Sequence, residues 1–219
     1  MTGFNQSTIE RMYRYWARTY ELLVPIYLLG NEGRLRAETI RALNLQPGQS
    51  VLDVACGTGS NFPLIQEQIG PTTGTLVGVD YTPAMLDQAR ARIQRRGWQN
   101  VQLVRSDAAQ LALGRQFDAA LCTLAMSVIP DYQGALQRML AHVRPGGWVV
   151  IADAKHSSRW YAQSFNFIAD LLGWGAAGDI SRRPWEALAR HVGDYAYREW
   201  FMGFFYVAGG LVHHNSDEA

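Results

Sequence analysis

The stretch VLDVACGTGSN, residues 51 to 61, decides the fold of this chain. It begins with strand formers, and it continues with one carboxylate, Asp53, and two glycines, Gly57 and Gly59. Glycine is costly inside a strand or a helix, but it is favoured where the backbone takes a positive φ or where a ligand approaches the main chain. The stretch therefore predicts a strand, a tight ligand-binding turn and the start of a helix.

Short apolar runs alternate with helix-like segments on both sides of this turn. The runs are SVLDVA, GTLVGVD, VQLVRSD, FDAALCTL and WVVIAD, and they are mostly uncharged until their C-terminal ends, as expected of parallel strands buried on both faces. The alternation predicts a doubly wound, Rossmann-like α/β fold, with a mostly parallel sheet of about seven strands and helices on both faces. The helix-like segments are Asn61 to Ile69, Pro83 to Arg95 and Tyr132 to Val143.

A length of 219 residues suits a single domain with one large core. Helix-like spacing of apolar residues near the N-terminus predicts amphipathic helices within residues 1–45, the segment that we name the helical lid. We expect a cofactor-binding core over residues 48–155, a substrate-side cap with the last strands over residues 156–210, and a polar tail over residues 211–219. Within the cap, the run WFMGFFYVAGG is predicted to be a strand.

The composition limits the classes of partner. A formal net charge of +1 gives no broad basic surface that would favour nucleic acid. Two cysteines without metal-binding spacing predict neither a disulfide framework nor a zinc site, and they suit a reducing, cytoplasmic location. The sequence shows no signal-peptide pattern and no apolar stretch of membrane-spanning length, so we expect at most peripheral contact with a membrane.

The ligand of the glycine turn is predicted from the residues around it. A dinucleotide fingerprint would place a third glycine at position 62, but Phe62 stands there and argues against a bound pyrophosphate. The charge of Asp53 suits an ammonium group or stays solvated. Asp80, which ends the second predicted strand, can accept both hydroxyls of a ribose. These features predict a nucleoside with a cationic tail.

The end of the third predicted strand fits the base of such a nucleoside. Asp107 can accept the amino group of an adenine, and its small neighbour Ala108 leaves room for the ring. Taken together, the motifs DVACGTG, VGVDYTPAMLDQAR, SDA and RPGGWVVIAD resemble the class I S-adenosylmethionine-dependent methyltransferases. The resemblance covers residues 51 to about 153. It implies S-adenosylmethionine as the cofactor and S-adenosylhomocysteine as its product.

The resemblance also implies roles for individual residues. The glycines that match Gly57 and Gly59 line the methionine part of the cofactor, and Asp80 and Asp107 bind its ribose and its adenine. The N-terminal YRYWARTYELL looks like the helix that closes the cofactor pocket, with Tyr20 near the methionine carboxylate. The cofactor-binding residues expected on this basis are Asp53, Ala55, Gly57, Gly59, Asp80, Tyr81, Met85, Asp107, Ala108 and Tyr20.

Two further stretches narrow the resemblance. LAMSVIPDY, residues 124 to 132, and the run WFMGFFYVAGG look like small bacterial N-methyltransferases that act on phosphatidylethanolamine or betaine-lipid precursors. Quinone C-methyltransferases share much of this pattern. The predicted partner is therefore a small molecule or a lipid head group, with a peripheral membrane surface as a second partner.

The acceptor side offers few candidate residues. His156 follows the strand WVVIAD, and a histidine there can take a proton from an amine, so His156 and Tyr20 are the predicted catalytic residues. No metal site is predicted. The arginines of the cap either meet anionic head groups or form a solvated face, and they are Arg159, Arg182, Arg183 and Arg190.

The leading functional hypothesis is methyl transfer to an amine head group by direct in-line displacement. A competing hypothesis is C-methylation of a quinol or another small molecule. Aminocarboxypropyl transfer and cyclisation of the cofactor would use the same fold, so both stay open. A cofactor-binding sensor or partner subunit without catalysis is the hypothesis outside the enzymes. The sequence does not predict the oligomeric state.

Overall fold

The computed structural model describes residues 28–171 and 178–213. Most of the predicted lid, with Tyr20, and most of the predicted tail lie outside the described residues. The strands are β1 (Ser50–Val54), β2 (Thr75–Asp80), β3 (Val101–Arg105), β4 (Phe117–Thr123), β5 (Val143–Ala154), β6 (Val192–Trp200) and β7 (Phe205–Val212). The helices are α3 (Glu32–Ala42), α4 (Phe62–Ile69), α5 (Pro83–Arg96), α6 (Tyr132–Ala141), α7 (Ser164–Leu171) and α8 (Pro184–Ala189), with short 3-10 turns η1 (Ala108–Gln110), η2 (Trp160–Ala162) and η3 (Phe201–Gly203).

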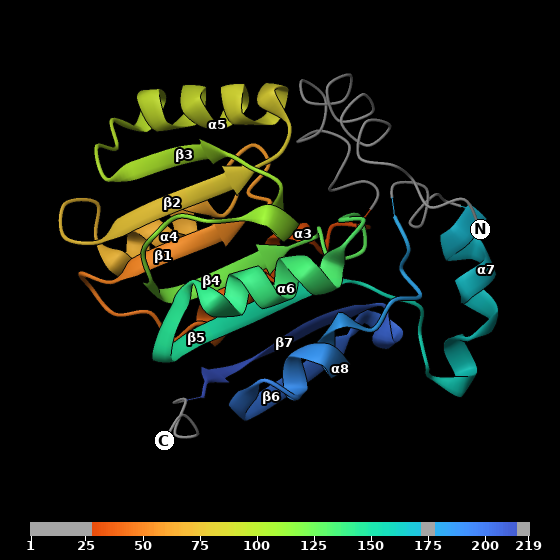
Figure 1. The fold of residues 1–219 in the computed structure, drawn as a ribbon. Helices are drawn as coiled ribbons and strands as arrows, with labels where there is room; N and C mark the ends of the chain where they lie inside the picture. The colour runs from red at the N-terminus through yellow and green to blue at the C-terminus, as the bar shows by residue number, and fades with distance from the viewer. Residues whose placement is uncertain (1–27, 172–177, 214–219) are drawn as a thin grey trace.

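The strands form one seven-stranded sheet in the order β3-β2-β1-β4-β5-β7-β6 (Figure 1). Strands β1 to β5 pair in parallel, whereas β7 is antiparallel to both β5 and β6. The predicted Rossmann-like, mostly parallel sheet is confirmed. Its strand order reverses between β1 and β4, and in sheets of this kind ligands bind beyond the carboxyl ends of the strands at such a switch point.

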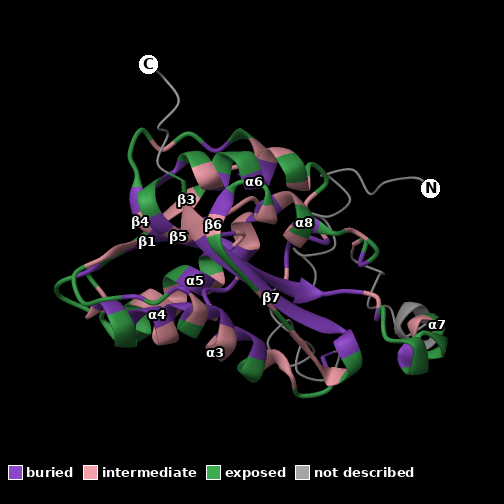
Figure 2. Ribbon diagram, turned by 90° about the horizontal axis from the view of Figure 1, so that it is seen from below, coloured by how far each residue is buried: buried purple, intermediate pink, exposed green. Residues whose placement is uncertain are grey.

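Side chains of successive strand residues enter two hydrophobic cores, one on each face of the sheet. In β1, Val51 belongs to the core that includes Leu35 of α3 and Ile65 of α4. Its neighbour Leu52 belongs to the opposite core, which includes Leu136 of α6. Figure 1 shows α6 and α8 on the near face of the sheet, and Figure 2 shows β7 buried along most of its length. Burial on both faces explains why the predicted strands read as continuous apolar runs.

The structure differs from the prediction at the end of the chain. Strand β6 lies inside the predicted substrate-side cap, in a part that was not among the runs predicted to be strands. It is the edge strand of the sheet and is partly exposed, so its sequence lacks the continuous apolar run of a buried strand. The run WFMGFFYVAGG is not one strand, because Phe201, Met202 and Gly203 take positive φ and form η3 before β7 begins.

One helix boundary also differs. The helix predicted to reach Val143 ends at Ala141, because Val143 already pairs with Phe117 of β4. Strand β5 therefore includes the RPGG sequence, whose proline and glycines are typical of a loop. The described helices lack the combination of length and apolar character that crossing a membrane requires.

Candidate active site

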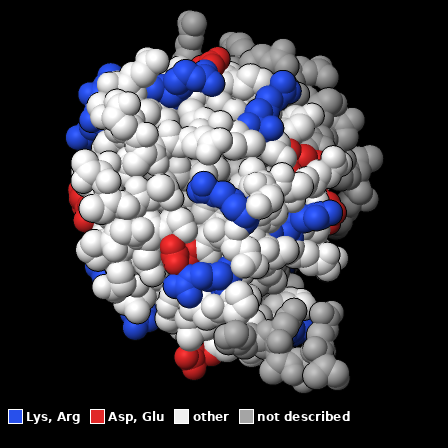
Figure 3. Space-filling model, turned by 60° about the vertical axis from the view of Figure 1, so that its left-hand side comes forward, with Lys and Arg blue, Asp and Glu red and all other residues white. Residues whose placement is uncertain are grey.

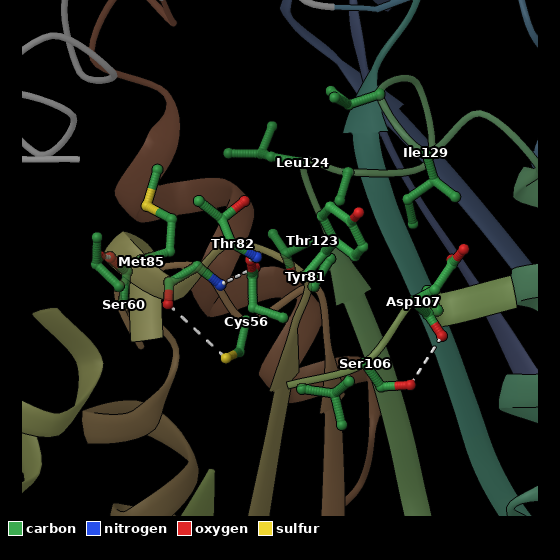
Figure 4. A pocket seen from close by; sticks show the side chains of 18 of the residues that line it. Cys56, Ser60, Tyr81, Thr82, Met85, Ser106, Asp107, Thr123, Leu124 and Ile129 are labelled. Carbon is green, nitrogen blue, oxygen red and sulfur yellow. Dashed lines mark hydrogen bonds between the residues drawn. The ribbon is translucent and has the colours of Figure 1, made fainter. Parts of the chain in front are cut away.

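A cavity lies at the carboxyl ends of β1 to β4, on the switch point of the sheet (Figure 4). Its lining comes from four places along the core: the turn after β1, the end of β2 with the start of α5, the residues after β3 and the turn after β4. One further lining residue, Arg36, comes from α3. The predicted cofactor-binding residues that line the cavity are Ala55, Gly57, Asp80, Tyr81, Met85, Asp107 and Ala108.

Asp80 joins the turn after β1 to the end of β2. Its Oδ2 accepts the backbone N–H of Gly57 at 2.9 Å, and its Oδ1 accepts the backbone N–H of Thr82 at 2.8 Å. Burial raises the pKa of the carboxyl group, although these two hydrogen bonds oppose the rise. Each carboxylate oxygen keeps acceptor capacity beyond its backbone partner. Asp80 can therefore bind two hydroxyl groups of a ligand while it holds the loop.

Asp107 lies on another side of the cavity, after β3 (Figure 4). Its Oδ1 accepts the backbone N–H of Ala109 at 3.0 Å and caps the short turn η1. The small, buried Ala108 follows it, and the ring of Tyr81 lies under the guanidinium of Arg105 at 5.8 Å. This arrangement suits a flat ring with an amino group at its edge.

The two glycines of the turn have different tasks. Gly57 has a φ of +56°, lines the cavity, and faces open space where a Cβ would stand. Gly59 has a φ of +74° and is not among the described lining residues, and a Cβ there would come within 2.6 Å of the Phe62 ring. In the structure this glycine makes room for Phe62, which is fully buried beneath the loop, and its contact with the methionine part stays a prediction.

Asp53 also lies behind the cavity rather than in its wall. It is fully buried, and both of its oxygens accept from Asn61 Nδ2, at 3.2 and 3.1 Å. Burial raises the pKa of Asp53 to about 7, since the charged form loses its hydration. The expectation of a solvated carboxylate is therefore wrong. Asn61 connects Asp53 to Arg36, which lines the cavity, and a cofactor-binding role of Asp53 stays a prediction.

Arg36 is a site residue that the sequence analysis missed. Its Nη1 donates to Asn61 Oδ1 at 2.8 Å, and its Nε donates to Glu32 Oε1 at 2.9 Å. Among the described residues that line the cavity, Arg36 carries the single basic side chain. Its sequence context, an ordinary charged helix, gives no signal of this position, because the partner Asn61 lies 25 residues away.

The turn after β4 closes the cavity with an aliphatic wall. Leu124, which has a φ of +58°, donates its backbone N–H to Ala152 O at 2.7 Å. Figure 4 shows the side chains of Leu124 and Ile129 on this side of the cavity. We use "aliphatic wall" for the lining residues Leu124, Ala125, Val128, Ile129 and Pro130.

His156 and the cap arginines lie elsewhere. His156 donates its backbone N–H to Ile180 O at 3.1 Å and is not among the described lining residues, so its catalytic role stays a prediction. Arg182, which the sequence assigns to head groups or solvent, turns inward to backbone carbonyl groups. Arg159 and Arg183 pair with Glu199 and Glu186, at 2.5 and 2.9 Å.

Charge is spread thinly over the face drawn in Figure 3. Basic side chains of the described residues stand there in separate groups among uncharged atoms. Within residues 28–171 and 178–213, no three histidine, cysteine or carboxylate side chains come together as a metal site would need. The cavity at the switch point is lined by two carboxylates, Asp80 and Asp107.

Comparisons with known proteins match this geometry. Residues 51–147, which supply most of the cavity, match the family model described as "Methyltransferase domain". The demethylmenaquinone methyltransferase of Geobacillus stearothermophilus is 27% identical over 213 residues, which cover 93% of this chain and 90% of the relative. The protein is an S-adenosylmethionine-dependent methyltransferase.

Two solved structures with bound S-adenosylhomocysteine have the same fold as this methyltransferase. The DhpI complex with S-adenosylhomocysteine superposes with a TM-score of 0.64 at 21% identity, covering 94% of this chain and 96% of that one. The N-methyltransferase NodS of Bradyrhizobium japonicum, also with S-adenosylhomocysteine, gives a TM-score of 0.63 at 14% identity, covering 84% and 88%. S-adenosylmethionine is the cofactor of the methyltransferase.

Proposed function

We propose that this methyltransferase methylates a ring carbon of a reduced quinone, a quinol of the demethylmenaquinol type. Two observations support the proposal. The relative from Geobacillus stearothermophilus, similar over 93% of this chain, is named a demethylmenaquinone methyltransferase. The aliphatic wall offers a flat apolar ring a surface to pack on, and this wall carries the proposal. The quinol is therefore preferred to the amine head group as the acceptor.

Each part of the cofactor has a proposed partner in the cavity. We assign the ribose hydroxyls to Asp80, whose oxygens keep free acceptor capacity, and the adenine amino group to Asp107. The open space over Gly57 accommodates the methionine part beside a bare backbone. When bound, S-adenosylmethionine supplies a methyl group on a positively charged sulfonium, which makes that carbon electrophilic.

Arg36 is the proposed partner of the cofactor's carboxylate. A guanidinium carries five N–H donors, and the bonds to Glu32 and Asn61 leave donors that no other residue of the described ranges is seen to engage. The side chain is fixed by these partners, so little conformational entropy is lost on binding. Asn61 links Arg36 to Asp53, which places a buried acid behind the carboxylate subsite.

The residues of the acceptor side act mainly by orientation and by excluding water. Holding the ring carbon in line with the methyl group can contribute about 7 to 11 kcal/mol in well-aligned systems. The aliphatic wall gives an ammonium group neither a carboxylate nor an aromatic ring to contact, in contrast to what an amine acceptor needs. Carbon methylation also requires that a quinol hydroxyl lose its proton. His156, which lies two residues after the end of β5, is the proposed base.

A direct competition between acceptors tests the proposal. The protein is incubated with cofactor carrying a labelled methyl group, and with reduced polyprenyl naphthoquinone and phosphatidylethanolamine in the same detergent. The proposal predicts label in the naphthoquinol fraction alone, and no transfer when the quinone is kept oxidised. Label in the lipid amine would contradict it. Turnover of any acceptor would also separate an enzyme from a cofactor sensor.

A further inference from the structure

The turn that carries the aliphatic wall is held from outside by residues 178–183. Asp179 donates its backbone N–H to the carbonyl of Ser127 at 2.8 Å. The preceding Gly178 lies so close that a Cβ on it would collide with the same carbonyl group. Two segments about fifty residues apart in the sequence thus touch through their backbones, and the position of one fixes that of the other.

Arg182 completes this contact from the outer side. Its Nη1 donates to Ile129 O at 2.5 Å and lies 3.4 Å from Met126 O. Its guanidinium lies over the ring of Tyr132, 5.2 Å from the centroid, and its Nε is 3.6 Å from Asp179 Oδ2. The side chain is 22% exposed, so these contacts are largely shielded from water.

The same turn is held from the sheet side by Asp153. Its Oδ2 accepts the backbone N–H of Ser127 at 2.9 Å, and Asp153 is buried at the end of β5. Ser127 is therefore bound through its N–H to the sheet and through its carbonyl to Asp179. The neighbouring Val128 and Ile129 line the cavity, so any shift of the turn changes the shape of the wall.

We propose that Arg182 is a positioning residue for the acceptor: by holding the carbonyl groups of Met126 and Ile129, it sets the aliphatic wall against which the acceptor ring packs. Arg182 itself is not among the described residues that line the cavity. Asp80 ends β2 and Asp107 follows β3, outside the turn that this arginine holds, so we expect the cofactor subsites not to depend on it. The inference rests on the proposed function in one respect, namely that the acceptor binds at the aliphatic wall.

Kinetics of Arg182→Gln and Arg182→Lys test the inference, with Arg183→Gln as the matched control. Arg183 is the next residue, its side chain is 61% exposed, and it pairs with Glu186. For Arg182→Gln we expect KM for the reduced naphthoquinone to rise about tenfold, because a charged donor to two carbonyl groups is lost. Arg182→Lys should recover part of the loss, since one ammonium cannot match the guanidinium fork.

The affinity for S-adenosylhomocysteine separates positioning from general damage. Arg182→Gln should change its dissociation constant by less than about twofold, because no direct cofactor contact is removed. Arg183→Gln should change neither quantity. Equal losses of acceptor and cofactor binding in Arg182→Gln, or an unchanged KM, would overturn the inference.

Hydrogen exchange decides the inference independently of the acceptor. With S-adenosylhomocysteine bound, the backbone amides of residues 125–130 should exchange faster in Arg182→Gln than in Arg183→Gln, while those of β1 and β2 should not differ. Identical exchange over residues 125–130 would overturn it. If the wild-type protein methylates no naphthoquinol but this difference is seen, the proposed acceptor is wrong and the positioning role of Arg182 stands.

Discussion

The backbone N–H of Gly57 donates to Asp80 Oδ2 at 2.9 Å, which couples the glycine turn after β1 to the carboxylate at the end of β2. Asp80 therefore helps to fix the turn after β1, which lines the same cavity. Because the same carboxylate accepts from Thr82, it fixes the start of α5 as well. A single side chain thus organises two of the segments that line the proposed cofactor site.

Asp80→Ala should weaken the binding of S-adenosylmethionine by at least about tenfold, because each charge-assisted hydrogen bond contributes about 1.5 to 3 kcal/mol. Asp80→Asn is the matched variant, since it keeps the size of the side chain but removes the charge and one acceptor. It should give a smaller loss. Isothermal titration calorimetry measures both dissociation constants, and values equal to that of the wild type would rule out the ribose assignment.

The two glycines of the turn should respond differently to alanine. Gly59→Ala places a Cβ against the Phe62 ring at a left-handed φ of +74°. The left-handed conformation alone costs an L residue about 1 to 2 kcal/mol. Because the clash with Phe62 adds to this cost, the free energy of unfolding should fall by more than that amount. In Gly57→Ala the new Cβ would stand in open space, so the variant should lose only the stability that the left-handed conformation costs. Its main effect should be on cofactor affinity. Urea unfolding of both variants measures the difference.

A double substitution checks the physical cause. Phe62→Leu in the Gly59→Ala background should recover part of the lost stability, because the smaller side chain makes room for the Cβ. The same substitution in the wild type should instead destabilise the core, since Phe62 is fully buried there. Purely additive effects of the two changes on the free energy of unfolding would show that the Phe62 ring is not the reason why position 59 requires glycine.

The buried acids predict how stability depends on pH. Burial raises the pKa of Asp53 to about 7 and that of Asp153 to about 6, so the folded protein keeps protons that the unfolded chain releases above about pH 4. The free energy of unfolding should therefore fall as pH rises from about 4 to about 7. Asp53→Asn should flatten the curve between about pH 6 and 7, and Asp153→Asn should flatten it at lower pH. Urea unfolding at a series of pH values measures these slopes, and an unchanged slope in Asp53→Asn would contradict the burial argument.

His156 is tested by the pH dependence of kcat/KM with the reduced naphthoquinone. If His156 is the base, activity should fall toward acidic pH, and His156→Ala should lower kcat by about 10² to 10⁴ with little change in cofactor affinity. An acidic limb that persists in the variant would show that another group, or water, takes the proton.

The fold was largely predictable because its signals are local. Parallel strands buried on both faces read as apolar runs, and a carboxylate after such a run lies at the edge of the sheet where ligands bind. Asp80 and Asp107 were located in this way, and both line the cavity. Asp53 and Gly59 occupy equally suggestive positions, but their side of the turn faces the core, which sequence alone does not reveal.

The remaining features depend on contacts between distant parts of the chain. Arg36 meets Asn61 across 25 residues, and Arg182 meets Ile129 across 53 residues. Neither arginine differs in its sequence context from the arginines at the surface. Strand β6 was missed for a related reason, since an edge strand that is partly exposed carries polar residues that resemble a loop.

The central claim is that the methyl group goes to a ring carbon of a quinol, and the position of the transferred group tests it most directly. The product formed from reduced naphthoquinone and cofactor with a ¹³C-labelled methyl group is purified and examined by NMR. Methylation of a ring carbon predicts a methyl signal of the ring-bonded type, coupled to ring carbons and absent when Asp80→Ala replaces the wild type at low cofactor concentration. A methyl signal of the oxygen-bonded type, or no labelled quinol while the label enters an amine, would contradict it.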